Sequence, residues 1–361
     1  MKRATVSAIC VIAILCSCLF IGGCSKNGDE TSTTSQAAVS SNAATTKVQT
    51  KATEEQHDGN LNPYTGAYDM DPDGTSRPVG VMIGNNPTSR PQFGIETADL
   101  YFEIETEGSI SRIMAVWASA DRMPETVGPC RSARTPFVKI AKSLDLVYLH
   151  VGGSTTGKAK INELGLADFD GNSGSSIFWR DQELINSRGY EYSMMATGSK
   201  VLNYMKNEEY RLESNQGPLF TFGNKKGDGA GKVATIDVTG SQTVIFRYDE
   251  STGLYTKSND DWDPEQVHNV YNADNKKVPI TVSNVLVLYA DKSMENNTTC
   301  DFSLSGDGVL ITGGTSRDIT YYNDGTGFSF SEVDGSEMIV NPGKTYICVV
   351  NSALSGRTDL Q

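Results

Sequence analysis

The sequence has few of the residues that metal and redox chemistry require. Its 361 residues include only 3 histidines, and neither an HExxH segment nor a CxxC pair occurs. Zinc sites are built from such closely spaced histidine and cysteine ligands. We therefore expect no bound metal and no cofactor.

Basic residues are also in deficit. The chain has 31 Lys and Arg against 44 Asp and Glu, a formal net charge of -13. Nucleic acids and anionic lipid surfaces attract proteins through clustered positive charge. The balance argues against nucleic acid as a partner, although it leaves room for a local basic pocket.

Cysteines outside the N-terminal region are few as well. Of 7 cysteines, only Cys130, Cys300 and Cys348 follow residue 24. An odd number in an exported chain allows at most one disulfide. Cys300 and Cys348 lie in strand-like segments of the second half and could pair, or all three thiols could stay free.

The N-terminus has the pattern of a lipoprotein export signal. Lys2 and Arg3 precede an apolar run over residues 4–21, which Gly22-Gly23-Cys24 follows. A basic start, an apolar core and small residues before the cut are typical of secretion, and a cysteine at the cut adds a lipid anchor. We predict a signal peptide over residues 1–23 and a lipid-anchored protein on the extracytoplasmic face of the cell membrane. An ordinary signal peptide or an uncleaved anchor is the alternative.

Residues 24–60 predict a disordered tether behind the lipidated Cys24. From residue 25 on they are rich in Ser, Thr, Ala and Gln, with Val39 and Val48 as the only large aliphatic residues before Leu61. Such a segment cannot bury enough apolar surface to offset the entropy of ordering it.

The remaining chain predicts two domains. Residues 61–212 mix strand-like runs at 78–83, 100–105, 112–118 and 146–151 with helical runs at 135–144, 157–164 and 199–208. Residues 213–232 shift to Gly, Asn and Lys, which suggests a linker. Residues 233–361 hold short apolar or alternating runs between turn signals. We expect an α+β fold, with a mixed α/β N-terminal domain followed by a mostly β C-terminal domain.

Two acidic or glycine-rich motifs resemble ligand loops. Residues 152–159 (Gly-Gly-Ser-Thr-Thr-Gly-Lys-Ala) follow a strand and open a helix, but Ala159 replaces the hydroxyl residue that holds magnesium in a phosphate loop. We predict only an anion site there, at the helix start, formed by Gly152, Gly153 and Ser154. Asp69, Asp71 and Asp73 open like a calcium loop, but Gly80 stands where a bidentate Glu belongs, so we interpret them as an acidic turn.

Charged residues of the first half suggest a site. Glu103, Glu105 and Glu107 alternate and would share one strand face if the strand continued. His150 ends a strand just before the glycine loop, where ligands of α/β layers bind. Candidate ligand-binding residues are Arg112, Arg131, Ser132, Arg134, His150, Gly152, Gly153 and Ser154. The alternative is a buried salt-bridge network.

These segments together resemble a known family. The residues that carry the resemblance are 90–92 (Arg-Pro-Gln), 98–103 (Ala-Asp-Leu-Tyr-Phe-Glu), 107–112 (Glu-Gly-Ser-Ile-Ser-Arg), 128–134 (Gly-Pro-Cys-Arg-Ser-Ala-Arg) and 150–154 (His-Val-Gly-Gly-Ser). The chain resembles the YerB-like lipoproteins over residues 62–350. The resemblance implies a lipid-anchored surface protein of Gram-positive bacteria with a domain of unknown function and a companion C-terminal domain. It implies no established reaction.

Two classes of function follow. The first is a non-catalytic envelope module that binds an anionic wall polymer or a membrane protein partner, with Arg112, Arg131 and Arg134 as carboxylate or phosphate forks. We favour it. The second is a hydrolase or transferase on an envelope glycan or phosphodiester polymer, with Glu107 and His150 as acid and base. A solute-binding protein fits less well, because the β-rich second half does not match an α/β lobe.

The lipid anchor can be tested directly. Cys24→Ala should shift the protein from the membrane fraction to the medium, or leave the signal uncleaved, because the variant has no thiol to carry lipid. Cell fractionation and the mass of the mature chain measure this. Unchanged fractionation with an unchanged mature mass would contradict lipidation.

Overall fold

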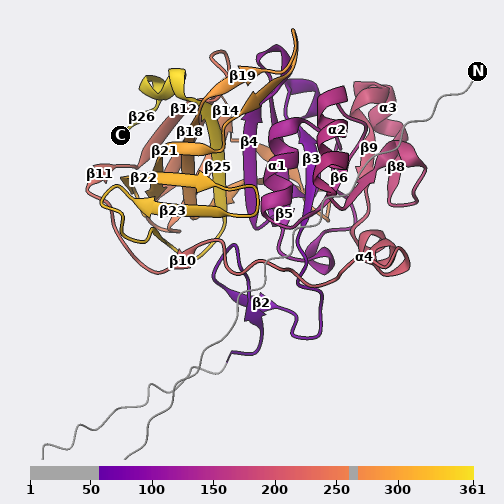
Figure 1. Cartoon of the computed structure of the whole chain (residues 1–361), viewed down its shortest axis with the longest axis horizontal. Coiled ribbons are helices and arrows are strands. Elements are labelled where there is room, and N and C mark those ends of the chain that lie inside the picture. Colours follow the sequence, from indigo (N-terminus) through magenta and orange to yellow (C-terminus); the bar gives the residue numbers. More distant parts are fainter. Residues whose placement is uncertain (1–56, 260–266) are drawn as a thin grey trace, which may run out of the picture. The chain divides into compact units, whose positions relative to one another are not determined.

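The computed structural model describes residues 57–259 and 267–361, which belong to one compact unit (Figure 1). The predicted signal peptide, Cys24 and the tether up to residue 56 lie outside the described residues. Within the described ranges, no helix has both the length and the apolar character needed to cross a membrane.

One large sheet runs through this unit. Its strand order is β11-β22-β21-β18-β25-β4-β5-β3-β6-β7, and β23 pairs with β22. The first half supplies β3 (Val79–Gly84), β4 (Leu100–Glu105), β5 (Ser111–Trp117), β6 (Val147–His150) and β7 (Asp168–Asp170). The later chain supplies β11 (Gly229–Ala230), β18 (Asn284–Ala290), β21 (Ser305–Thr312), β22 (Thr315–Asn323), β23 (Phe328–Glu332) and β25 (Thr345–Asn351).

The two halves meet inside this sheet. Strand β25 pairs in parallel with β4, in a register that runs from Thr345 opposite Leu100 to Val349 opposite Ile104. Every residue of β4 is buried. The predicted α+β class, with a mixed first half and a mostly β second half, is confirmed, and the two halves share one sheet.

The segment predicted as a linker, residues 213–232, contains two short strands that pair with strands of the second half. Its β10 (Thr221–Phe222) pairs in parallel with β24 (Ile339–Val340), and its β11 pairs with β22. Phe220, just before β10, is buried. The boundaries of the two domains stay a prediction.

Helices cover one face of the large sheet. Figure 1 shows α1 (Thr135–Ser143) and α2 (Thr155–Leu164) in front of the strands of the first half. Helix α1 starts with Pro136 in its first turn, a favoured position for proline, and buries Phe137 and Ile140. Both helices begin and end within two residues of their predicted bounds. Helix α4 (Gly198–Asn207) was predicted too, and α3 (Gln182–Arg188) was not.

A smaller sheet covers the other face. Its order is β17-β14-β13-β12-β26, formed by β12 (Val233–Asp237), β13 (Thr243–Asp249), β14 (Leu254–Asn259), β17 (Thr281–Val282) and β26 (Asp359–Leu360). Two-stranded pairs complete the fold: β1 (Asn60–Leu61) with β2 (Tyr68–Met70), β8 (Phe178–Arg180) with β9 (Met194–Ala196), β15 (Asn269–Tyr271) with β16 (Lys277–Pro279), and β19 (Lys292–Met294) with β20 (Cys300–Phe302).

The side chains of strand β4 alternate between two hydrophobic cores, one on each face of the large sheet. Because successive side chains point to opposite faces, Leu100, Phe102 and Ile104 pack in the core that also contains residues of α1 and α2. Tyr101 packs instead with residues of the smaller sheet. Glu103 shares the face of Tyr101 and is therefore buried between two sheets.

A polar network compensates the buried charge of Glu103. Its carboxylate accepts hydrogen bonds from Asn85 Nδ2 at 2.7 Å, Ser111 Oγ at 2.6 Å and Tyr346 OH at 2.6 Å. Lys257 Nζ lies 3.4 Å from it, and both side chains are 0% exposed. Burial lowers the pKa of Lys257, and the charge of Glu103 opposes this change.

This network continues through Lys257 to the first half. Lys257 Nζ donates to Asn259 Oδ1 at 2.6 Å and lies 3.2 Å from His268 Nδ1. His268 Nε2 lies 2.8 Å from Gln92 Oε1, and Gln92 Nε2 donates to the main chain of β3. The network thus connects β4, β14 and the segment after β3.

We expect Glu103→Gln to destabilise the fold, because it leaves the Lys257 ammonium buried without a counter-ion. Breaking such a pair from one side costs about 3 to 5 kcal/mol. Replacing both partners, as Glu103→Leu with Lys257→Met, should cost less than Glu103→Gln alone. Urea denaturation measures both losses. Glu250→Gln, which breaks the exposed pair with Lys232, is the control and should melt like the wild type; equal losses for Glu103→Gln and Glu250→Gln would contradict a buried charge pair.

Candidate functional site

Topology gathers the predicted site residues at one edge of the large sheet. Strand β6 runs parallel to β3 and to β7, while β5 runs antiparallel to both β3 and β4. The carboxyl ends of β3, β4, β6 and β7 and the start of β5 therefore lie at the same edge. Ligands of α/β sheets bind at such edges.

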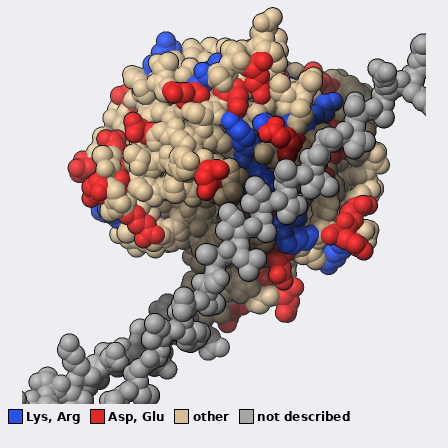
Figure 2. Space-filling view, viewed as in Figure 1, with Lys and Arg blue, Asp and Glu red and all other residues tan. Residues whose placement is uncertain are grey.

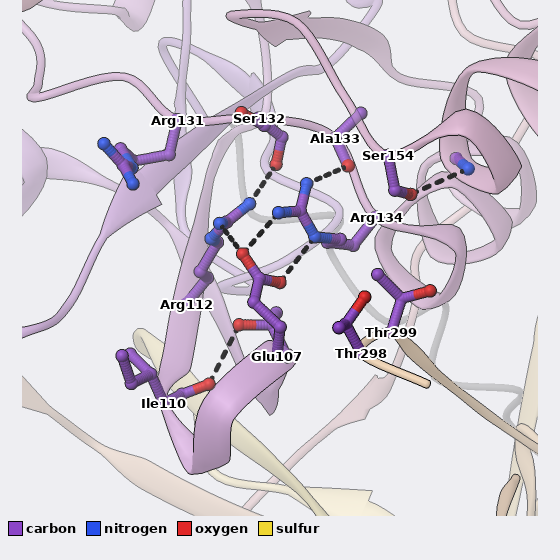
Figure 3. A network of polar contacts seen from close by, with 12 residues as sticks. Glu107, Ile110, Arg112, Arg131, Ser132, Ala133, Arg134, Ser154, Thr298 and Thr299 are labelled. Carbon is purple, nitrogen blue, oxygen red and sulfur yellow. Dashed lines mark hydrogen bonds and ion pairs between the residues drawn. The ribbon is translucent and has the colours of Figure 1, made fainter. Parts of the chain in front are cut away.

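An arginine and glutamate cluster, formed by Glu107, Arg112 and Arg134, lies at this edge (Figure 3). Arg134 Nε donates to Glu107 Oε2 at 2.6 Å, and its Nη2 donates to Oε1. Arg112 Nη2 donates to the same Oε1 at 2.5 Å. One carboxylate is thus shared by two guanidinium groups, which leaves the cluster with a surplus of one positive charge.

Main-chain carbonyls hold both arginines in place. Arg112 Nη1 donates to the carbonyl of Ser132 at 2.6 Å, and Arg134 Nη1 donates to the carbonyl of Ala133 at 2.8 Å. The side chains of Arg112 and Arg134 are 7% and 11% exposed, against 32% for Glu107. The arginines are therefore fixed, and the carboxylate is the more accessible partner.

Glu107 lies on a turn and not on the strand. Strand β4 ends at Glu105, and Glu107 begins a short 3-10 turn, Glu107–Ser109. Gly108 and Ser109 in that turn have φ angles of 66° and 54°. The expectation that three glutamates share one strand face is therefore wrong for Glu107, because the chain turns before it.

Electrostatics keeps the carboxylate ionised. Burial alone would raise the pKa of Glu107, but the hydrogen bond from Arg134 and the charge of Arg112 outweigh it and lower the pKa to about 2. Burial lowers the pKa of Arg112 to about 9, the charge of Arg134 acts in the same direction, and Glu107 opposes both. At neutral pH Glu107 therefore has no proton to donate.

A groove of about 500 Å³ adjoins this cluster. Its lining residues come from the turn after β4 and from the β19–β20 hairpin: Glu105, Thr106, Glu107, Gly108, Ser109, Lys292, Met294, Asn297, Thr298 and Cys300. Lys292 Nζ donates to Glu105 Oε1 at 2.6 Å. Thr298 lines the groove together with Glu107, and Figure 3 shows its side chain below that of Arg134.

Arg131 belongs to a different contact. Its Nη1 donates to the carbonyl of Glu191 at 2.9 Å, its Nη2 donates to Glu191 Oε1 at 2.5 Å, and its guanidinium lies 5.0 Å from the centre of the Tyr192 ring. Figure 3 shows it pointing away from Glu107. Ser132 contributes its carbonyl to Arg112, so it acts through the main chain.

His150 is held inside the protein. It is 1% exposed, with Nδ1 2.7 Å from the carbonyl of Gly152 and Nε2 3.0 Å from Asp168 Oδ2. Since a carbonyl only accepts, Nδ1 donates to it. Both ring nitrogens are engaged by protein atoms, and His150 does not line the groove. His150 and Asp168 thus pair inside the protein, as in the buried salt-bridge network named as the alternative.

Two N–H groups of the glycine loop donate to protein atoms. Gly152 N donates to Asp170 Oδ1 at 2.7 Å, and Ser154 N donates to the carbonyl of Ala133 at 3.2 Å. The Ser154 hydroxyl caps α2 by accepting from Gly157 N. Gly152 N and Ser154 N therefore already have acceptors within the protein, and the anion site at Gly152, Gly153 and Ser154 stays a prediction.

The other motifs also have structural partners. Asp69 Oδ2 accepts from Arg122 at 3.0 Å, and Asp71 Oδ1 accepts from Asp73 N at 3.0 Å. Within residues 57–259 and 267–361, no three His, Cys, Asp or Glu side chains are placed to hold a metal ion.

The three cysteines of the described chain are free and buried. A Cys300–Cys348 disulfide therefore does not form. Burial raises the pKa of Cys300 to about 11 and raises that of Cys130 and of Cys348 as well. Because the thiolate is the reactive form, these are structural thiols.

Sequence reasoning missed the hairpin side of the groove. Lys292 and Thr298 lie almost two hundred positions beyond Glu105, and no local motif marks them. Only the pairing of β25 with β4, together with β18 beside β25, brings that hairpin close.

Comparison with known proteins connects this fold to others. Residues 64–211 match the family described as "Protein of unknown function (DUF3048) N-terminal domain", and residues 234–347 match its C-terminal domain. The chain is 31% identical over 292 residues to "Putative lipoprotein YerB" of Bacillus subtilis (strain 168). The aligned region covers 76% of this chain and 81% of that protein.

A solved structure has a similar fold. The crystal structure of the YerB protein from Bacillus subtilis superposes with a TM-score of 0.71 at 24% identity, over 83% of this chain and 98% of that one. At this identity the likeness concerns the fold alone. The matches to both domains and the 31% identity to the Bacillus subtilis lipoprotein show that the chain belongs to the YerB-like family of DUF3048 proteins.

Proposed function

We propose that the protein is a non-catalytic, lipid-anchored binding module of the cell envelope. It recognises an anionic group, a carboxylate or a phosphate, of a wall polymer or a membrane-associated ligand at the Glu107, Arg112 and Arg134 cluster. The lipid anchor rests on the N-terminal signal pattern and on the relative whose name describes a lipoprotein.

One observation carries this proposal: two fixed guanidinium groups share one accessible carboxylate, that of Glu107, which lines a groove. Arginine forks bind carboxylates and phosphates through paired hydrogen bonds. Both forks are already held by the carbonyls of residues 132 and 133. A ligand anion therefore finds them preorganised, which reduces the entropy that binding costs.

Glu107 occupies the place that a ligand anion would take. Its turn is more exposed than the arginines, and Gly108 gives that turn freedom at a positive φ. A bound carboxylate or phosphate would displace the Glu107 carboxylate from Arg134 and take over its hydrogen bonds. The surplus positive charge of the cluster favours that exchange.

The local charge differs from that of the whole chain. The formal net charge is -13, yet Figure 2 shows basic side chains gathered over α1 and α2 in this view, among scattered acidic ones. Such a basic region raises the local concentration of anionic ligands.

The catalytic alternative, a hydrolase or transferase on an envelope polymer, needs an acid or base with a suitable pKa in the groove. Glu107 has a pKa of about 2, and His150 is buried with both nitrogens engaged. Neither observation favours acid–base chemistry, and we do not adopt it.

The proposal is tested by titrating the full mature chain in detergent with polyglycerol phosphate and with muropeptides that carry free carboxylates. Arg134→Gln should weaken binding of at least one probe by tenfold or more. Glu107→Gln should strengthen it, because the internal competitor is lost. Isothermal titration calorimetry measures both.

A matched control is Lys232→Gln, which removes one positive charge from an exposed pair elsewhere. It should leave binding unchanged. If Arg134→Gln and Lys232→Gln bind alike, or if Glu107→Gln weakens binding as much as Arg134→Gln does, Glu107 and Arg134 are scaffold and the proposal fails.

The cluster should also make stability depend on pH. Because the folded pKa of Glu107 is about 2, below its ordinary value of 4.5, its stabilisation is present above about pH 4.5 and is lost as the pH falls toward 2. Allowing for one-third exposure, we expect about 1 to 2 kcal/mol. The difference in unfolding free energy between wild type and Glu107→Gln should shrink over this range, and a difference that stays constant with pH would contradict it.

A further inference from the structure

A second, larger groove lies at the opposite edge of the large sheet. It has a volume of about 760 Å³ and lies beside the chain just before β25, where Gly343 N donates to the carbonyl of Thr65. Residues that line it include Tyr68, Phe222, Phe328, Phe330, Glu337 and Pro342. The groove draws on β2, β10, β23 and the turn before β25, and it shares no residue with the groove at Glu107.

Its floor is a row of four aromatic rings. The centroids of Phe222 and Phe220 are 6.1 Å apart, those of Phe220 and Phe330 are 5.4 Å apart, and those of Phe330 and Phe328 are 5.7 Å apart. Phe328 and Phe330 alternate along β23 and so share one face. Phe220 is buried, and the other three rings are half-buried. The rings of Phe328 and Phe330 are nearly parallel, at 8° to each other, whereas Phe220 lies at 87° to Phe222 and at 46° to Phe330. The groove is therefore lined by the partly exposed rings of Phe222, Phe328 and Phe330 above the buried Phe220.

Local backbone makes room for this row. A Cβ on Gly66 would lie only 2.4 Å from the Phe222 ring, and Gly66 has a φ of 69°. Glycine is therefore required where the 62–67 turn meets that ring. Tyr68, 48% exposed, extends the aromatic lining beyond it, with one face of its ring stacked on His57 at 3.5 Å between centroids.

The rim of the groove is polar and carries no positive charge. The Thr221 hydroxyl donates to Glu337 Oε1, and Ser329 lies between Phe328 and Phe330 on β23. Among the described residues that line the groove, Glu337 alone is charged. Such a lining repels anions, so neither a phosphate polymer nor an anionic membrane surface complements it.

From this chemistry we infer that the groove binds an uncharged stretch of a glycan chain. Sugar rings present C–H faces that pack on aromatic rings, and their hydroxyls need the kind of donors and acceptors that Thr221, Ser329 and Glu337 place at the rim. A row of rings in an open groove suits a polymer of repeated units. This inference is independent of the proposed anion site.

The tether of the chain itself does not fit this groove. Residues 25–56 contain no aromatic residue and only Val39 and Val48 as large aliphatic side chains. Those residues cannot fill an aromatic groove of this volume.

The test is calorimetric titration of the full mature chain in detergent with the neutral hexamer of β-1,4-linked N-acetylglucosamine. We expect binding that Phe328→Ala and Tyr68→Ala each weaken by about tenfold or more. Phe328→Leu keeps the apolar volume and removes the ring, and it should weaken binding almost as much. Tyr322→Ala, which removes a 59% exposed aromatic ring outside the groove, should bind like the wild type.

Three results would overturn the inference. The first is that the wild type shows no detectable binding to the hexamer at millimolar concentration. The second is that Phe328→Leu binds the hexamer as tightly as the wild type, and the third is that Tyr322→Ala weakens binding as much as Phe328→Ala does. Tighter binding after deletion of residues 25–56 would assign the groove to the tether. A sedimentation equilibrium dimer that Tyr68→Ala dissociates would assign it to a second copy. Failure of Arg134→Gln to affect anion binding bears only on the site at Glu107.

Discussion

The parallel pairing of β25 with β4 holds together everything else in this structure. It joins two halves that are far apart in sequence into one sheet. It also brings the Tyr346 hydroxyl of β25 within hydrogen-bond distance of the Glu103 carboxylate of β4. The carboxylate there also faces Lys257 from the smaller sheet. Burying these ions is expensive unless every lone pair and proton is satisfied, so the network permits one register and one relative position of the strands.

Both candidate sites depend on that junction. At the carboxyl edge of β4, the turn at Glu107 lies across a groove from the β19–β20 hairpin of the second half. At the other edge, the turn after β1 meets β10, β23 and the segment before β25. The first groove is lined by Glu107, whose carboxylate is shared by two arginines, and the second has aromatic rings and no cation among its described lining. The protein thus has two chemically different grooves, which we propose bind different parts of an envelope polymer.

Many of the elements could be predicted from local patterns. The bounds of β4 were expected to the residue, and those of α1, α2 and α4 within two, because apolar periodicity and glycine or proline punctuation act over a few positions. Helix α3 was missed, since it is short and buries only Leu184. Of the site, Arg112, Arg134 and Glu107 were chosen from the sequence, whereas Arg131 and His150 turned out to be engaged with Glu191 and Asp168.

The export signal pattern, the α+β class, the family and the charged residues near the strand ends can all be predicted from the amino-acid sequence. Which of these charged residues meet depends on how distant segments pack. The alternation that puts Glu103 and Arg112 on opposite faces, the turn that carries Glu107 back to two arginines, and the hairpin at Lys292 that closes the groove all depend on contacts between distant segments. Local propensity extends over one turn or one strand, but pairing across nearly two hundred residues is set by the free energy of burying a shared core.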